Sequence, residues 1–161
     1  MKLKGMRVIT KVVNEFTSTF GVRAEWGLEF EAVPADKAIT FTVVVGSYMN
    51  EAFLEDAENR FPAVHANLFL WLLMHEIGHC MTDYLWDVKD EAYFMKAKKK
   101  MPETFETTLE SNDWYHKMPD EYMATKWAGE YMAHHSKKME KFNSKMNRAM
   151  KKFCRRNRVT P

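Results

Sequence analysis

Apolar residues first recur at helical spacing. They stand at Val8, Val12, Phe16 and Phe20. Gly21 follows at the position of a helix C-cap, where a glycine readily adopts the left-handed conformation that ends a helix. This pattern predicts an opening helix that ends near Gly21.

The spacing then changes to that of strands. Trp26, Leu28 and Phe30 alternate with small or charged residues, and residues 38–45 form a run rich in β-branched side chains. The Pro-Ala-Asp stretch at 34–36 is typical of a turn. We therefore expect two antiparallel strands joined by that turn.

A long apolar segment follows at residues 63–86. It contains no proline, its only glycine is Gly78, and Pro62 precedes it at a position favoured at the start of a helix. Because the segment is apolar almost all the way round, it predicts one helix that runs through the interior of the domain.

The second half of the chain is expected to be helical. Residues 90–101 and 103–109 are consistent with short helices, and residues 111–113 with a loop. Pro119, followed by two acids, predicts the start of another helix, which either continues into the C-terminal stretch or breaks near residues 134–136. The expected fold class is α+β, mainly helical, with an N-terminal helix and a small antiparallel sheet packed on the buried helix.

The buried helix carries the motif HExxH as His75, Glu76 and His79. Successive residues turn by about 100°, so the two imidazoles point to one side and could reach one ion, while Glu76 projects beside them. Burying these groups in an apolar helix is costly unless a cation compensates, and Zn²⁺ is the best candidate. The motif then predicts hydrolysis by a water held at the zinc, with Glu76 as general base.

A family resemblance suggests which residue completes the zinc site of His75 and His79. The HEIGH segment, followed by Glu121 and Ala124 at the start of a later helix, resembles the zincin metallopeptidases of gluzincin type. The similarity is to minimal single-domain forms, including the repressor-cleaving peptidases of phages and mobile elements. The resemblance implies that Glu121 is the third zinc ligand and that a peptide or protein is the substrate.

One position departs from that family. Where the family usually has an aspartate that orients a ligand histidine, this chain has Thr125, which offers a hydroxyl without a charge. Asp83, Asp87 or Asp120 is an alternative partner for the ligand histidines. Small side chains at Ala124 and Ala128 would let this helix approach the HExxH helix closely.

Other residues compete for the role of third ligand. His116, just before Pro119, is the strongest rival. Glu130 lies on the opposite side of a straight helix from Glu121, and His135 lies about 21 Å further along by helix rise.

Two further functional roles have several candidates. The donor that would stabilise a tetrahedral oxyanion is sought among the Tyr and His residues after the motif. These candidates are Tyr115, His116, Tyr131 and His134. In zincins the strand beside the active-site helix binds an extended substrate, and the resemblance assigns that role to Ile39, Phe41 and Val43.

Charge is divided unevenly along the chain. Residues 1–136 hold 14 Lys or Arg and 21 Asp or Glu, whereas residues 137–161 hold 10 basic residues and one acid. We expect a zincin-like domain over 1–136 and a basic helical tail over 137–161 that belongs to the same domain. The tail is a solvated helix face, or docks on the acidic body of its own chain, or attracts a nucleic acid or another acidic surface. The alternative to an enzyme is therefore a zinc-stabilised binding module that associates with nucleic acid.

The cysteines and the apolar segments bear on the type of scaffold and on the expected cellular location. Cys80 and Cys154 form no CxxC pair, which argues against a disulfide scaffold and a cysteine-rich zinc site. Cys80 points away from the histidine pair and is expected in the core. The first 16 residues carry charges through the region where a signal peptide would be apolar, and no segment is apolar enough for a membrane span. These features favour a cytoplasmic protein without membrane contact.

Overall fold

The computed structural model describes most of the chain around the HExxH motif. The described residues are 5–42, 68–85, 92, 95–96, 99–100, 102, 104, 106, 110, 114–115 and 117–157. The predicted helix start at Pro62, the short helices at 90–109 as continuous elements, and the candidates Val43 and His116 lie outside them.

The opening helix is confirmed. Helix α1 (Met6–Thr17) buries Ile9, Val13 and Phe16, and a 3-10 turn, η1 (Ser18–Phe20), continues it. Gly21 ends this turn with φ of 71°, the left-handed conformation expected at a C-cap.

The predicted antiparallel pair joined by the turn at 34–36 is present, but the sheet has a further, parallel strand that was not predicted. It has three strands in the order β1-β3-β2, namely β1 (Arg23–Trp26), β2 (Glu31–Val33) and β3 (Ala38–Phe41). Strand β3 pairs in parallel with β1 and antiparallel with β2, so the sheet is mixed. The predicted turn is correct, because the 3-10 turn η2 (Pro34–Asp36) joins β2 to β3.

The predicted strand around Trp26, Leu28 and Phe30 is divided, because β1 ends at Trp26 and β2 begins only at Glu31. The backbone N–H of Gly27 donates a hydrogen bond to the carbonyl of Phe41 as the chain crosses the end of β3. The parallel register puts Ala24 beside Ile39, and both side chains are 1% exposed. Burial of these two apolar residues in the core favours the observed pairing.

The HExxH helix is buried as predicted. Helix α3 (Leu68–Thr82) places Leu70, Trp71 and Ile77 in the core with no exposed surface, and a 3-10 turn, η3 (Asp83–Leu85), follows it. Lys37 lies between η2 and β3, and its ammonium donates a hydrogen bond to the carbonyl of Cys80 in the last turn of α3. A cation at the negative end of the helix stabilises it and ties α3 to the sheet.

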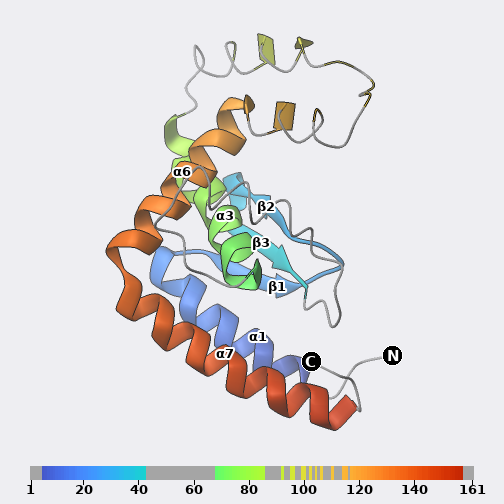
Figure 1. Ribbon diagram of the computed structural model, residues 1–161, viewed down its shortest axis with the longest axis vertical. Coiled ribbons are helices and arrows are strands. Elements are labelled where there is room, and N and C mark those ends of the chain that lie inside the picture. The colour runs from blue at the N-terminus through green and yellow to red at the C-terminus, as the bar shows by residue number, and fades with distance from the viewer. Residues whose placement is uncertain are drawn as a thin grey trace.

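Two further helices follow in the described part of the chain. They are separated by His135, whose backbone is not helical. Helix α6 (Pro119–His134) packs on α3, and helix α7 (Ser136–Asn157) packs on α1, as Figure 1 shows. The α1–α7 contact is apolar and includes the stacked rings of Phe16 and Phe142, with centroids 4.1 Å apart. None of the helices in the described part of the chain combines the length and apolar character needed to cross a lipid bilayer.

Candidate metal centre

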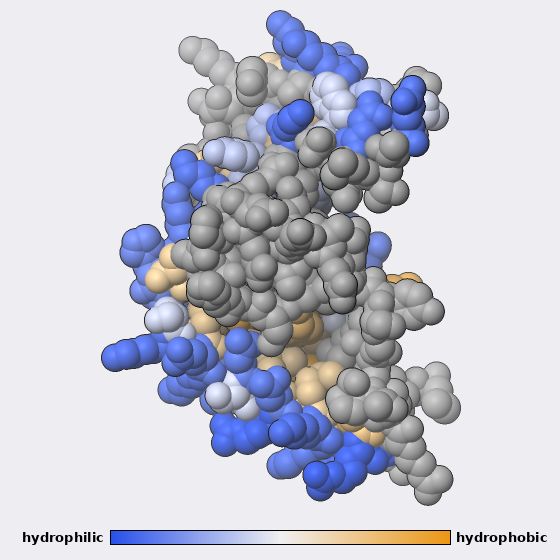
Figure 2. All heavy atoms as spheres, viewed as in Figure 1, coloured by the Kyte–Doolittle hydropathy of each residue, from blue (hydrophilic) through white to orange (hydrophobic). Residues whose placement is uncertain are grey.

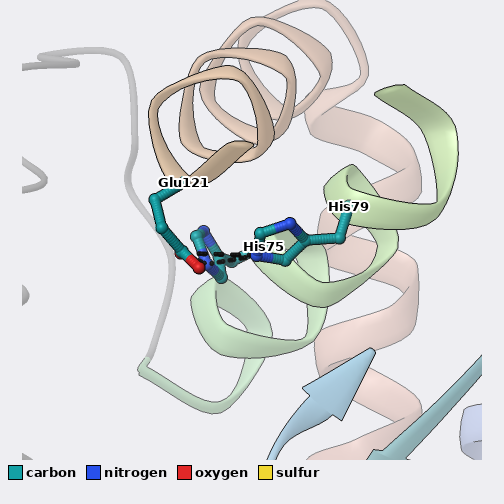
Figure 3. A group of neighbouring side chains, drawn as sticks. All are labelled: His75, His79 and Glu121. Atoms are coloured by element: carbon teal, nitrogen blue, oxygen red, sulfur yellow. Dashed lines mark hydrogen bonds and ion pairs between the residues drawn. The ribbon is translucent and has the colours of Figure 1, made fainter. Parts of the chain in front are cut away.

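Three side chains from two helices converge on one point. His75 and His79 come from α3 and Glu121 from the first turn of α6, and they face one another in Figure 3. The Nε2 atom of His75 lies 2.9 Å from Oε2 of Glu121 and 3.2 Å from Nε2 of His79, and the remaining His79–Glu121 distance is 3.3 Å. Within the described residues, these three side chains form the group of His, Cys, Asp or Glu that could hold a metal ion.

The donor triangle has the size that a metal ion requires. In a tetrahedral site with bonds of about 2.0–2.1 Å, neighbouring donor atoms are about 3.3 Å apart. The observed edges of 2.9, 3.2 and 3.3 Å are close to that value. The two imidazole nitrogens and one carboxylate oxygen therefore fit a small divalent cation without rearrangement of the helices.

The close approach of α3 and α6 brings Glu121 to the histidines. Gly78 lies against the backbone of Ala124, such that a Cβ at Gly78 would be 2.5 Å from the Ala124 carbonyl oxygen. Ala124 and Ala128 have no exposed surface, as expected for small residues at a tight helix contact. Glu121 stands one turn before Ala124, so this contact sets the distance between its carboxylate and α3.

Thr125 contacts the far side of the His75 ring. Its Oγ1 atom lies 3.1 Å from Nδ1 of His75, and the two residues are 4% and 2% exposed. A hydrogen bond at Nδ1 orients the ring so that Nε2 faces the metal position. The hydroxyl thus contacts one of the two motif histidines, the candidate ligand His75. Asp120 acts on His79 through its charge, and Asp87 lies outside the described residues.

Glu76 lies beside the ligand group and not in it. The side chain is 8% exposed. Burial raises the pKa of Glu76, and the neighbouring imidazoles of His75 and His79 offset part of this rise. A carboxyl group with a raised pKa next to a metal position is suited to accept and return a proton near neutral pH.

The pKa values of the candidate ligands His79 and Glu121 reflect their contact with each other. Burial acts to raise the pKa of Glu121, but hydrogen bonds from His75 and His79 outweigh it and hold the pKa well below its usual range. Burial acts to lower the pKa of His79, but the hydrogen bond and charge of Glu121 outweigh that effect and raise it. The carboxylate is therefore anionic at neutral pH and attracts positive charge to the centre.

Of the predicted oxyanion donors that lie in the described residues, Tyr115 is the one that reaches the centre. Burial raises the pKa of Tyr115, and the charge and hydrogen bond of Glu121 raise it further, as does the charge of Glu76. The phenol is therefore protonated at neutral pH and can donate a hydrogen bond. The ring remains 43% exposed, so it is accessible from solvent.

The structure does not bring Tyr131 or His134 to the centre. The Tyr131 ring stacks on His135 with centroids 3.9 Å apart, and its hydroxyl accepts a hydrogen bond from Lys138 at 2.9 Å. The exposed His134 contacts the carbonyl of Glu130 through Nδ1 at 2.6 Å. Both side chains thus have partners near the α6–α7 junction, and sequence alone gave no sign of the Lys138 contact.

The predicted substrate strand is also wrong for its described residues. Ile39 and Phe41 lie in β3, between β1 and β2, and are 1% and 0% exposed. A strand that is paired on both sides cannot accept a peptide by strand addition. Within the described residues the outer edge on the side of α3 belongs to β2, and its Glu31 raises the pKa of Glu76 slightly through its charge. With only three residues, β2 was too short for sequence periodicity to reveal.

Cys80 belongs to the core, as predicted. It has no exposed surface, and burial raises the pKa of its thiol to about 11. The thiol is therefore protonated and unreactive at neutral pH.

Comparison with known proteins assigns no family to this chain. No protein-family model, no curated protein and no solved structure matches this chain.

Proposed function

We propose that this protein is a zinc-dependent metallopeptidase that hydrolyses peptide bonds. The observation that carries the proposal is the convergence of Glu121 on the His75–His79 pair, with the buried Glu76 left free beside them. Three side-chain ligands leave one position of a tetrahedral ion for water or substrate, whereas structural zinc sites are usually closed by four residues.

The donor chemistry favours zinc over other common ions. Two imidazoles and one carboxylate are typical of zinc in hydrolases, while Mg²⁺ and Ca²⁺ prefer oxygen ligands. His75, His79 and Glu121 would hold the ion, which would supply a water of lowered pKa and a polarised substrate carbonyl.

Glu76 supplies the proton transfers. It accepts a proton from the water as the oxygen attacks the peptide carbonyl, and it returns that proton to the amine when the C–N bond breaks. Its raised pKa suits both steps, because the group must be a base in the first and an acid in the second. Tyr115 donates a hydrogen bond to the oxyanion that develops on the carbonyl oxygen.

The proposal is tested by replacing Glu76 with glutamine. We expect the purified protein to contain one zinc per chain by mass spectrometry and to cleave an unfolded protein or a quenched peptide library. The E76Q variant should retain zinc but lose at least about 100-fold in cleavage rate, because the base is gone and the ligands remain.

The matched control is E130Q, on the exposed side of α6. It should cleave as the wild type does. The proposal fails if E76Q cleaves as well as the wild type, if E130Q loses as much activity, or if well-folded protein supplied with Zn²⁺ cleaves neither substrate.

A further inference from the structure

The solvent side of α7 carries a stripe of positive charge that the proposed peptidase site does not use. We define this stripe, the α7 basic stripe, by five exposed residues: Lys137, Lys141, Arg148, Lys152 and Arg155. Their spacing along the helix places them within an arc of about 60° and over a length of about 27 Å. Figure 2 shows hydrophilic side chains along the lower edge of the molecule, where α7 lies in Figure 1.

The stripe is rigid because the opposite face of α7 is buried. Met139, Phe142, Met146 and Phe153 are at most 6% exposed and pack in the core with α1. The cations are therefore held on a straight support and are not part of a mobile tail. This leaves their charge directed to solvent.

Helix α1 extends the same basic surface. An open groove of about 750 Å³ is lined by Arg7 and Lys11 of α1 and by Arg156 at the end of α7. A smaller groove between the helices is lined by Lys138, Lys141 and Lys145 of α7 and by Glu15 of α1. Helix α1 thus adds Arg7 and Lys11 to the positive charge near the C-terminal end of α7.

Among the described residues of α1 and α7, few acids neutralise this surface. Glu140 is the only acidic residue of α7, and Glu15 of α1 pairs with Lys145 at 3.4 Å, outside the stripe as defined. The full chain has a net charge of only +2, so the positive field is local to this face. Such a field attracts a polyanion.

We infer that the α7 basic stripe binds the phosphate backbone of duplex nucleic acid. Within α7, all of whose residues are described, the exposed positions are Lys, Arg, Ser, Asn or Glu140, and none is apolar. Protein interfaces depend on apolar and aromatic anchors, which these exposed positions lack. Amphipathic helices enter membranes through an apolar face, and α7 has buried its apolar face against its own chain. Bases of single strands stack on exposed aromatic rings, and this face has none among its described residues. Contacts with duplex phosphates need only placed cations.

Fluorescence anisotropy with the full chain tests this inference. The probes are labelled 25-base-pair duplexes of DNA and of RNA with the same sequence, titrated at several salt concentrations. Five phosphate contacts predict a slope of about −4.5 in the logarithm of affinity against the logarithm of salt concentration. Salt-dependent binding of either duplex with this slope supports the inference.

The decisive variant neutralises the centre of the stripe, as K141Q/R148Q/K152Q. We expect at least a 10-fold weaker affinity and a salt slope smaller by about 3. The matched control, K96Q/K99Q/K100Q, removes three exposed cations elsewhere and should bind as the wild type does. Circular dichroism and thermal unfolding establish that both variants are folded.

Three outcomes would overturn the inference. The first is a stripe variant that binds duplexes as well as the wild type, and the second is an equal loss in the control variant. The third is displacement of the duplex by polyglutamate at equal charge concentration, which would indicate an acidic polypeptide as the partner. None of these measurements requires zinc or cleavage, so they are independent of the proposed peptidase activity.

Discussion

Gly78 of the HExxH motif lies against the backbone of Ala124, and a Cβ at Gly78 would be 2.5 Å from the Ala124 carbonyl oxygen. The same Cβ would also lie 3.0 Å from the carbonyl carbon and the Cα of Ala124. Because backbone atoms cannot move aside as a flexible side chain can, the contact requires glycine. It also fixes the helix that carries Glu121 against the helix that carries the histidines.

The substitution G78A should therefore destabilise the protein. Replacing glycine by alanine inside a helix normally stabilises it by about 1 kcal/mol, but here we expect the free energy of unfolding to fall by about 1–3 kcal/mol. The zinc content should fall as well, because α6 is displaced. Denaturant unfolding and metal analysis measure the two effects, and G78V should be worse. The double variant G78A/A124G should be as unstable as G78A, because the clash is with the backbone of residue 124. A G78A variant that is as stable as the wild type and binds zinc would contradict this account.

Glu121 is expected to be required for metal binding. In E121Q the neutral amide is a weaker ligand and leaves less negative charge beside the imidazoles, so the zinc dissociation constant should rise by about 100-fold or more. Isothermal titration with Zn²⁺ measures this change. The control is E130Q, nine residues further along α6, which should bind zinc as the wild type does. Equal zinc affinities in E121Q and the wild type would exclude Glu121 as a ligand.

The helical part of the site was predictable because its signals are local. His75 and His79 are one turn apart, so their shared direction follows from helix geometry alone. The family resemblance placed Thr125 beside a ligand histidine, without specifying which one, and its hydroxyl contacts Nδ1 of His75. The choice of Glu121 itself came from a family resemblance, and the helix contact through Gly78 now gives it a physical basis.

Predictions failed where pairing depends on residues far apart in the sequence. The partner of β1 is β3, and nothing in the alternation around Trp26 specifies a parallel neighbour. Tyr131 was a reasonable oxyanion donor by residue type, but Lys138 and His135 hold it at the α6–α7 junction. Both outcomes are set by tertiary packing, which overrides local pattern.

Thr125 should influence zinc affinity through its hydroxyl. T125V keeps the shape of the side chain but leaves Nδ1 of His75 without its partner at 3.1 Å. We expect about 10-fold to 100-fold weaker zinc binding, the usual effect of losing such a contact. T125S keeps the hydroxyl and should bind zinc within about threefold of the wild type. Equal affinity in T125V and T125S would show that the hydroxyl does not orient the ring.

Tyr115 should act on the chemical step more than on substrate binding. Removing its hydroxyl in Y115F takes away a donor for the oxyanion, so kcat should fall by about 100-fold while KM changes little. Steady-state kinetics on a quenched peptide separate the two parameters. Y122F is the matched control, because Tyr122 is similarly exposed, at 47%, and adjoins Glu121. A loss in KM alone would assign Tyr115 to substrate binding instead.

The metal-free protein should lose stability as the pH rises above neutrality. The pKa of His79 is raised in the folded state, so its stabilising contribution is complete below about pH 6.5 and is lost as the pH rises through the folded-state pKa. The pKa of Glu121 is lowered, so its contribution is present above about pH 4.5 and is lost as the pH falls toward the folded-state value. Without metal, Tm should therefore be higher at pH 6 than at pH 8.5.

Zinc should reverse this trend, because it binds neutral imidazoles and competes with their protons. The increase in Tm on adding Zn²⁺ to chelator-treated protein should thus grow from pH 5.5 to pH 8. Differential scanning calorimetry with and without Zn²⁺ measures both curves. H79Q should flatten the metal-free curve in this range, since it removes the group whose pKa is raised. A zinc effect on Tm that is constant with pH would contradict coordination by His75 and His79.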